Sequence, residues 1–333
     1  MPHDSQLRQP SARVVRVIAL ELLDDALTAA RRLRGGARSD DAEALHDFRV
    51  ATRRLRSWLR AWKPHLSDSV TPQACRRLRR IARATGPARD AEVHLEWLRF
   101  ERAKLRGRQR AGADWLIATL EDEQRAARED AVASARDFEP VHVKLSKQLH
   151  SYTIRLHPGR DADDEPFGKA LGDLSREYGA DLRRRLDAVR DYGDDTQAHR
   201  ARIAAKRLRY LLEPFSGARN GGTEIVERLT ALQELLGALH DAHVFSGEVT
   251  AASAAAAAEQ AMAVSEAVVE DALASELQRE RAGDPGPGLL AIARLLRRRG
   301  LAAFEAVRRD WLGDEAESFF AQLQAFATSL AST

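Results

Sequence analysis

The sequence of 333 residues is poor in the residue types that build sheets, disulfide frameworks and membrane spans. Aromatic residues make up only 6% of the chain, and Val, Ile and Tyr are sparse beside Ala, Leu, Arg and Glu, which disfavours an all-β fold. The single cysteine, Cys75, excludes an internal disulfide framework and suits a reducing compartment. No run of about 18 apolar residues occurs, and the first residues lack the apolar core of a secretory signal. We therefore expect a cytoplasmic, helical protein without a membrane span.

Lysine is also scarce, and the positive charge is unevenly placed. Only six of the 53 basic residues are lysines, so 47 are arginines, whose planar guanidinium group can hold two phosphate oxygens at once. With 50 acidic residues the net charge is only +3. The segment 46–89, however, holds twelve Lys or Arg against Asp47 and Asp68, a net charge of +10, so the rest of the chain sums to −7. This distribution favours a polyanionic partner over a general need for solubility.

Helical signals run through nearly the whole chain. Gly35 and Gly36 mark the end of a first long helix, and Asp40 with Glu43 forms a capping box for the next. The polar segment 157–166 contains two prolines and is the best candidate for a linker. We expect residues 1–12 to be disordered. The expected helices span about 13–34, 40–63, 71–84, 89–106, 112–136, 139–156, 167–192, 196–213, 223–237, 240–281, 288–310 and 314–330.

An internal repeat organises these helices. His46–Trp62 aligns without gaps on His199–Phe215, with seven identities in seventeen positions and an offset of 153 residues. Gly86–Val93 then matches Gly237–Val244, in the same order and at nearly the same offset. Two correlated matches indicate a duplication. The sequence therefore predicts an all-α fold of two tandem four-helix bundles, a first repeat at 13–156 and a second at 167–333.

The repeated helix carries a basic stripe on one face and apolar side chains on the other, at about 100° per residue. The apolar faces hold Phe48, Ala51, Leu55, Trp58, Leu59 and Trp62 in the first copy and Leu208, Leu211, Leu212 and Phe215 in the second. The helix expected at 71–84 adds four arginines at similar spacing. The candidate anion-binding residues are His46, Arg49, Arg53, Arg56 and Arg60; Arg76, Arg79, Arg80 and Arg83; and His199, Arg202, Lys206 and Arg209.

A second tier of residues surrounds these stripes. Arg54 and Arg207 lie between stripe and core, so we expect each to pair with a carboxylate. Asp90 and Asp241 follow a glycine break in both copies, where they either cap a helix or orient stripe arginines such as Arg54 and Arg207. Two lysines near the end of the first repeat either extend the basic cavity or are solvated: Lys144 and Lys147.

The stripes favour some functions over others. One Arg-rich helix is usually a solvated face, but two copies that keep His, Arg and Lys in register favour a binding surface. The stripe from His46 to Arg60 is about 21 Å long, which suits a linear polyanion, and no GxxxxGK[ST] or GxGxxG loop is present for a nucleotide. Nucleic acid is the alternative ligand, although no helix-turn-helix, zinc module or aromatic stacking platform is evident. A phosphohydrolase is disfavoured, because the stripes hold almost no acids for metal binding.

The two motifs resemble the conserved histidine α-helical domain, abbreviated CHAD. Its helix of the form His-x-x-Arg-[Val/Ile]-x-x-[Arg/Lys]-Arg-Leu-Arg is matched at His46–Arg56 and at His199–Arg209, and its Gly-x-x-Arg-Asp-x-x-Val turn at Gly86–Val93 and Gly237–Val244. The resemblance covers residues from about 13 to 333. It implies two four-helix bundles related by a pseudo-two-fold axis around a basic central cavity. It also implies that the chain binds inorganic polyphosphate, often at polyphosphate granules, without chemistry of its own, and that Arg89 joins the binding set.

Two positions depart from the family pattern, and one associated domain is not expected. Glu213 replaces Arg60, and His240 replaces Arg89, so the second half is expected to grip an anion more weakly or to add a pH dependence. CHAD domains often accompany a triphosphate tunnel metalloenzyme (CYTH) domain, but only about twelve residues precede the first expected helix. We therefore expect a stand-alone CHAD protein, with no cofactor and no metal, and with polyphosphate-metabolising or CYTH-type proteins as further partners.

Overall fold

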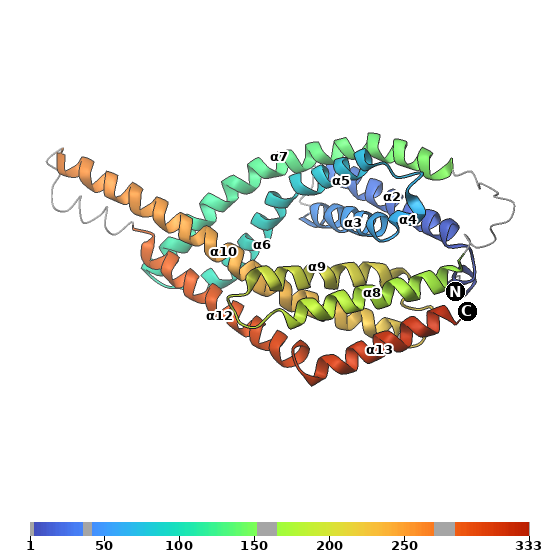
Figure 1. The fold of residues 1–333 in the computed structure, drawn as a ribbon. Coiled ribbons are helices and arrows are strands. Elements are labelled where there is room, and N and C mark those ends of the chain that lie inside the picture. The colour runs from blue at the N-terminus through green and yellow to red at the C-terminus, as the bar shows by residue number, and fades with distance from the viewer. Residues whose placement is uncertain (1–2, 36–41, 152–164, 270–283, 333) are drawn as a thin grey trace. The chain divides into compact units, whose positions relative to one another are not determined.

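The computed structural model describes residues 3–35, 42–151, 165–269 and 284–332, and helices dominate it (Figure 1). Within these residues no strand occurs, and the all-α class is confirmed. None of the helices described there is long and apolar enough to cross a membrane. The helices are α1 (His3–Leu7), α2 (Ser11–Gly35), α3 (Ala42–Ala61), α4 (Lys63–Leu66), α5 (Pro72–Ala84), α6 (Gly86–Arg102), α7 (Arg108–His150), α8 (Phe167–Asp187), α9 (Asp195–Leu212), η3 (Glu213–Phe215), α10 (Gly222–Val269), α12 (Gly286–Trp311) and α13 (Asp314–Ala331).

The chain forms two compact units, and each unit takes segments from both predicted repeats. The first unit comprises residues 1–86, 128–236 and 306–333, and the second comprises residues 87–127 and 237–305. The division does not fall at the expected linker, most of which (residues 157–164) lies outside the described residues. The tandem arrangement of two separate four-helix bundles stays a prediction.

In the first unit, the two copies of the repeated helix pack against each other. Helix α3 contacts α2, α5 and α9, while α8 contacts α9 and α13. Close approach of α8 and α13 requires glycine, because a Cβ at Gly172 would lie 2.4 Å from the carbonyl oxygen of Ala327. Both copies of the His-x-x-Arg helix are therefore positioned within one packed body.

The apolar faces predicted for the repeated helices form the core of the first unit. Trp58 is 1% exposed and donates from Nε1 to the carbonyl oxygen of Val15 at 3.0 Å. Trp62 packs on Phe167 with ring centroids 5.1 Å apart, and Phe167 packs on Phe215 at 4.9 Å. Trp62 and Phe215 hold corresponding positions in the two copies, so one aromatic cluster joins them. Truncating such a buried ring to alanine costs about 3–5 kcal/mol.

The prediction of a disordered N-terminus is wrong for the described part of that segment. Helix α1 contacts α8, and Leu7 is fully buried. The backbone N–H of Phe167 donates to the carbonyl oxygen of Gln9 at 2.9 Å, and the Ser11 hydroxyl donates to the carbonyl oxygen of Glu165 at 2.7 Å. These long-range contacts order a polar segment that has little helical pattern of its own.

Two helices continue where the sequence predicted breaks. Helix α7 runs from Arg108 to His150 through Pro140, and α10 runs from Gly222 to Val269 through Gly237. Leu236 and Leu239 on either side of Gly237 are at most 1% exposed. Tertiary burial therefore outweighs the local cost of glycine, about 1 kcal/mol relative to alanine in a helix interior.

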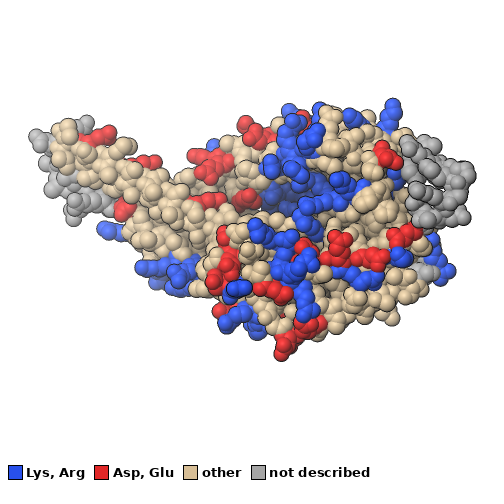
Figure 2. All heavy atoms as spheres, viewed as in Figure 1, with Lys and Arg blue, Asp and Glu red and all other residues tan. Residues whose placement is uncertain are grey.

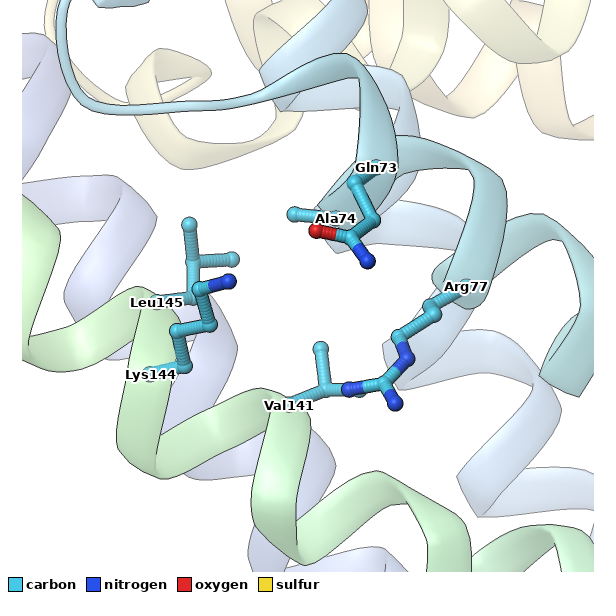
Figure 3. A pocket seen from close by; sticks show the side chains of 6 residues that line it. All are labelled: Gln73, Ala74, Arg77, Val141, Lys144 and Leu145. Atoms are coloured by element: carbon cyan, nitrogen blue, oxygen red, sulfur yellow. The ribbon is translucent and has the colours of Figure 1, made fainter.

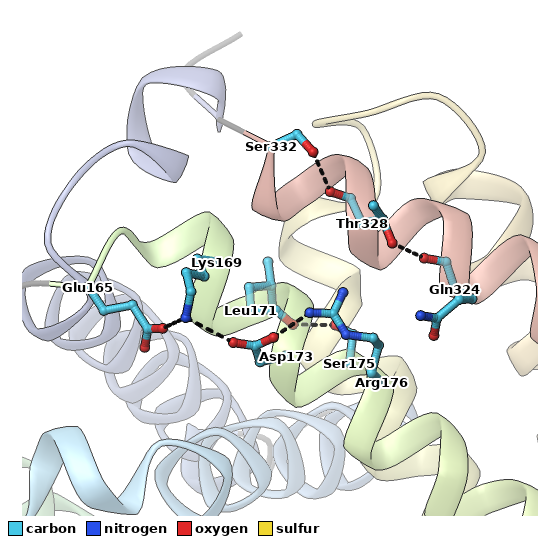
Figure 4. Close-up of polar contacts among 9 residues, drawn as sticks. All are labelled: Glu165, Lys169, Leu171, Asp173, Ser175, Arg176, Gln324, Thr328 and Ser332. Carbon is cyan, nitrogen blue, oxygen red and sulfur yellow. Dashed lines mark hydrogen bonds and ion pairs between the residues drawn. The ribbon is translucent and has the colours of Figure 1, made fainter.

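The exposed face of α8 is lined by alternating charges (Figure 4). Lys169 contacts Glu165 one turn before it and Asp173 one turn after it, and Arg176 in turn contacts Asp173. Pairs of opposite charge at this spacing stabilise a helix by about 0.2–0.5 kcal/mol each. This face is internally neutralised, in contrast to the stripes described below.

The second unit has its own core, built from α6, the first part of α7, the later part of α10, and α12. Leu98, Phe245 and Ile292 are at most 1% exposed within it. Helices α7 and α12 approach so closely at Gly112 that a Cβ on this residue would lie 2.6 Å from the Cα of Gly288. The buried ring of His94 stacks on Phe245 with centroids 4.1 Å apart.

Candidate functional site

The first basic stripe lies on α3, opposite the buried aromatic face. Phe48, Leu55 and Trp58 are at most 1% exposed and fix the rotation of the helix about its axis. The i, i+3 and i+4 spacing then directs the stripe away from the core. Four of its residues are half-buried and the last is exposed: His46, Arg49, Arg53, Arg56 and Arg60.

Helix α5 presents a second row of arginines beside α3. Thr71 caps its N-terminus by accepting a hydrogen bond from the backbone N–H of Ala74 at 3.2 Å, and Pro72 occupies the first turn. Leu78 and Ile81 are buried, which leaves the other face exposed. That face carries Arg76, Arg79, Arg80 and Arg83.

The arginines of α3 and α5 converge around Arg56. Burial lowers the pKa of the Arg56 guanidinium, and the charges of neighbouring arginines lower it further: Arg79, Arg53, Arg83 and Arg60. Like charges this close repel one another, and the repulsion is strongest where solvent is excluded. An anion bound among them would convert this repulsion into attraction.

These side chains line a pocket of about 560 Å³ in the first unit. Its apolar part consists of Leu59, Leu66, Val70, Pro72 and Leu78, and Cys75 lies at its wall. Five cations and no carboxylate complete the lining: Arg56, Arg60, Lys63, Arg76 and Arg79. Figure 2 shows Lys and Arg side chains gathered in a band across the middle of the visible face, over α5, α3 and α9. The pocket thus has the positive charge and the guanidinium donors suited to a polyanion.

The stripe of the second copy lies on α9, which packs against α3. It consists of His199, Arg202, Lys206 and Arg209. Burial lowers the pKa of His199, and the charges of Arg202 and Lys206 lower it further against the opposing effect of Asp195. Since the pocket described above is lined by residues 56–79 alone, a channel lined by both stripes stays a prediction.

Arg209 differs from its counterpart Arg56 in having partners inside the protein. Its Nε donates to Gln233 Oε1 at 3.1 Å, and its Nη1 lies 3.5 Å from Glu213 Oε1. Its guanidinium also lies over the ring of Tyr210, 4.6 Å from the centroid. Two of the three guanidinium nitrogens of Arg209 and one face of the group are therefore engaged within the protein.

The expectation that Arg54 pairs with a carboxylate is confirmed, and the partner is Glu213. Arg54 Nη2 lies 2.6 Å from Glu213 Oε1. Glu213 therefore does more than interrupt the second stripe, because its carboxylate links Arg54 of the first copy to Arg209 of the second. The same expectation is wrong for Arg207, which forms no ion pair with a carboxylate among the described residues. Burial lowers the pKa of its guanidinium, and the charge of Arg60 lowers it further.

The two lysines expected to extend the cavity line other pockets of the first unit. Lys144 faces Gln73 and Arg77 across a small pocket between α5 and α7 (Figure 3). Lys144 and Lys147 also line an open pocket with Arg34, Arg136 and Glu139. Neither lysine lines the pocket around Arg56, so the structure does not support their assignment to that cavity.

The remaining candidates belong to the second unit. Arg89 forms an ion pair with Glu92 one turn along α6, with Nη1 and Oε2 3.2 Å apart. Asp90 lies next to it on α6, while His240 and Asp241 lie within the continuous helix α10. Because α10 does not begin near Asp241, this residue does not cap a helix N-terminus. The roles of these four residues toward an anion stay predictions.

Lys63 and Cys75 line the pocket and Tyr178 lies near the stripes, although none of the three is among the candidates that the sequence indicated. Lys63 lines the pocket from the first turn of α4, and extending the helical wheel one residue past Trp62 would have placed it beside Arg56. No sequence pattern signals Cys75 or Tyr178. Across the described ranges, no group of three or more His, Cys, Asp or Glu side chains is placed to hold a metal ion.

The likeness to one solved structure supports this helical architecture. The chain aligns over 96% of its length with 93% of the crystal structure of the CHAD domain from the plant Ricinus communis, at 20% identity and a TM-score of 0.58. PptA from Streptomyces chartreusis aligns over 89% of this chain and 99% of its own, at 18% identity and a TM-score of 0.48. None of the proteins with curated functional descriptions matches the sequence. The family model of the CHAD domain matches residues 21–250, more than half of the chain, and the protein therefore belongs to the CHAD domain family.

Proposed function

We propose that this protein binds inorganic polyphosphate, without catalysing a reaction, through the basic surface of α3 and α5. The observation that carries this proposal is the pocket around Arg56, which is lined by five cations and no carboxylate. Phosphate oxygens accept charge-assisted hydrogen bonds from guanidinium groups, each contributing about 1.5–3 kcal/mol. The association of the CHAD family with polyphosphate binding supports the same ligand.

The shape of the basic surface favours a linear polyanion. The stripe on α3 continues from His46 to Arg60, and the arginines of α5 run beside it. Polyphosphate carries about one charge per phosphate and no bases, so it can follow cations without stacking partners. Trp58 and Trp62 are buried in the core and offer no platform for nucleic-acid bases.

The proposal is tested by titrating the full chain with long-chain polyphosphate, with duplex DNA of equal phosphate content and with inorganic monophosphate. Titrations at three salt concentrations separate shape recognition from counterion release, which weakens binding of both polymers as salt rises. We expect polyphosphate to bind more than tenfold more tightly than DNA near 150 mM salt, and monophosphate to bind weakly. Equal affinity for DNA and polyphosphate would contradict the proposal and favour a nucleic-acid ligand.

We also propose that the protein binds at polyphosphate granules in cells, where CYTH-type or other polyphosphate-metabolising proteins are candidate partners. A fluorescent fusion is expected to form foci in cells that accumulate polyphosphate. The foci should vanish in cells that cannot synthesise the polymer. Foci that persist there would contradict granule binding while leaving polyphosphate binding in vitro untouched.

A further inference from the structure

The ion pair between Arg54 and Glu213 has a counterpart that lacks the acid. In the register of the repeat, Arg54 corresponds to Arg207, and Glu213 corresponds to Arg60. The structure places the Glu213 carboxylate 2.6 Å from Arg54 and 3.5 Å from Arg209, between guanidinium groups of both copies. At the corresponding place the charge that acts on Arg207 is that of Arg60, a cation instead of a carboxylate.

The surroundings of this arginine pair are positive and partly buried. Tyr178 on α8 interacts with both guanidinium groups, and its burial raises the pKa of the hydroxyl, which stays protonated and able to donate. Two carboxylates act on the same place. Asp181 is held by Arg185 at 2.8 Å and by Arg184 at 3.2 Å, and Glu177 is a neighbour of Tyr178 on α8. The charge of Asp181 raises the pKa of Arg207, but burial and the charge of Arg60 outweigh it, so the carboxylates offset the positive charge of this pair only in part.

We propose that Arg60, Arg207 and Tyr178 form an anion site that takes one phosphate group where the counterpart holds the Glu213 carboxylate. This inference rests on the proposed function and deepens it. Glu213 shows that the arrangement of the two copies can hold an oxyanion between their arginines, because it already does so on one side. Arg60 also lines the pocket around Arg56, so a phosphate bound here can continue into that pocket as part of one polymer.

A directional path for the ligand follows from this asymmetry. The Glu213 carboxylate occupies one of the two corresponding places and repels a phosphate there. At the other place both side chains, Arg60 and Arg207, are cationic, so a phosphate of the polymer is attracted there. The two copies thus provide one anion site, at Arg207, and one place that the Glu213 carboxylate occupies, at Arg54. We expect the polymer to contact Arg207 and not Arg54.

Two separate charge reversals, at Arg60 and at Glu213, test the inference in both directions. Arg60→Glu installs an acid beside Arg207, as Glu213 stands beside Arg54. We expect its affinity for polyphosphate to fall about tenfold or more, while its melting temperature stays equal to that of the wild type or rises. Arg77→Glu is the matched control, because it makes the same charge change on the face of α5 toward α7. It is expected to lower the affinity less than threefold.

Glu213→Arg should create the missing second site. We expect at least a threefold gain in affinity and a salt slope steeper by about one phosphate contact, with a lower melting temperature because Arg54 and Arg209 lose their acid. Should this variant fail to fold, Glu213→Gln removes only the charge and is expected to give a smaller gain. Tyr178→Phe removes only the hydroxyl and should weaken binding about threefold.

The outcomes separate this inference from the proposed function. If the wild type prefers polyphosphate and Arg60→Glu behaves like Arg77→Glu, the anion site is wrong and the proposed function stands. If the wild type shows no preference for polyphosphate, the site is tested with inorganic tripolyphosphate alone. Thermal stabilisation by that probe in the wild type, lost in Arg60→Glu and kept in Arg77→Glu, would support the site. Equal stabilisation in all three would overturn it.

Discussion

Helix α5 and residues 223–235 of α10 occupy corresponding places in the two copies of the repeat, 151 residues apart by the register of Gly86 and Gly237. Their core faces agree: Leu78 and Ile81 correspond to Leu229 and Leu232, and all four side chains are at most 2% exposed. Their exposed faces differ. Arg76, Arg79, Arg80 and Arg83 correspond to Glu227, Thr230, Ala231 and Glu234.

The second copy shows which features the fold requires. A helix without these arginines packs with the same apolar residues, so the basic face of α5 is not needed for folding. It carries an electrostatic cost, since arginines near Arg56 repel one another. Retaining such a face in one copy alone is the pattern expected of a binding surface. The second copy instead uses Arg209 within the protein, through Gln233 and Glu213.

The largest expected effect comes from removing the pocket cations of the first copy. Arg56→Gln combined with Arg79→Gln deletes two charge-assisted contacts to phosphate. The expected loss is about 3 kcal/mol or more, about a hundredfold in the dissociation constant for polyphosphate. Isothermal titration calorimetry at fixed salt measures the loss, and the melting temperature should not fall, because the mutual repulsion around Arg56 is relieved.

The control for this pair is Arg77→Gln combined with Arg200→Gln. Both side chains are exposed and lie outside the pocket, and the change in net charge is the same. We expect a loss of less than fivefold from the weaker overall field. Equal losses in the two double variants would show that α3 and α5 act only as a general positive surface.

A smaller effect is expected from giving the second copy the character of the first. Glu227→Arg combined with Glu234→Arg restores the residue type of Arg76 and Arg83 on an exposed helix face. We expect a gain in polyphosphate affinity of about three- to tenfold, smaller than the preceding loss because Glu213 still holds Arg209. Asp137→Arg with Asp187→Arg makes the same charge change elsewhere. A gain of equal size there would show that net charge, and not this helix face, sets the affinity.

The smallest expected effect is a pH dependence from His199. Burial, Arg202 and Lys206 hold its pKa below the usual value of about 6.5, so the ring is neutral at pH 7 in the free protein. A nearby phosphate favours the protonated ring and raises its pKa. Affinity should therefore increase a few-fold as the pH falls from about 7.5 to about 5.5. His199→Gln should flatten this part of the profile, and an unchanged profile would place the bound polymer away from His199.

Protonation of His199 also makes the stability of the folded chain depend on pH. Since the folded pKa of His199 is depressed, the unfolded chain takes up a proton at higher pH than the folded chain. The contribution of the neutral ring to stability is present above the unfolded pKa. It is lost as the pH falls through that value toward the folded pKa. Bound polyphosphate should oppose this loss.

Much of the fold was predictable because periodicity reports burial directly. The apolar faces of α3 and α9, from Phe48 to Trp62 and from Leu208 to Phe215, form the core of the first unit as predicted, except that Ala51 is only half-buried. The positions of the helix ends were less predictable. Gly237 and Pro140 carry local signals for helix ends, yet burial on both sides keeps α10 and α7 continuous. The ordering of residues 9–11 depends on a contact with residues 165–167, which no local pattern contains.

The candidate site was predictable only within each helix. Spacing placed Arg53, Arg56 and Arg60 on one face, but it could not show that Arg79 of another helix meets Arg56. It identified Arg54 as a residue that needs an acid, yet gave no means to choose Glu213, which is 159 residues away. Contacts between helices depend on tertiary packing, and one sequence without its fold does not determine them.

The most direct test of the pocket uses Cys75, the single cysteine of the chain, which is exposed and lines the pocket around Arg56. The measurement is the rate of alkylation of Cys75 by uncharged N-ethylmaleimide, with and without long-chain polyphosphate at constant ionic strength. We predict at least tenfold protection in the wild type and little in Arg56→Gln/Arg79→Gln. Monophosphate of equal phosphate content should not protect. An alkylation rate that saturating polyphosphate leaves unchanged would contradict binding in this pocket.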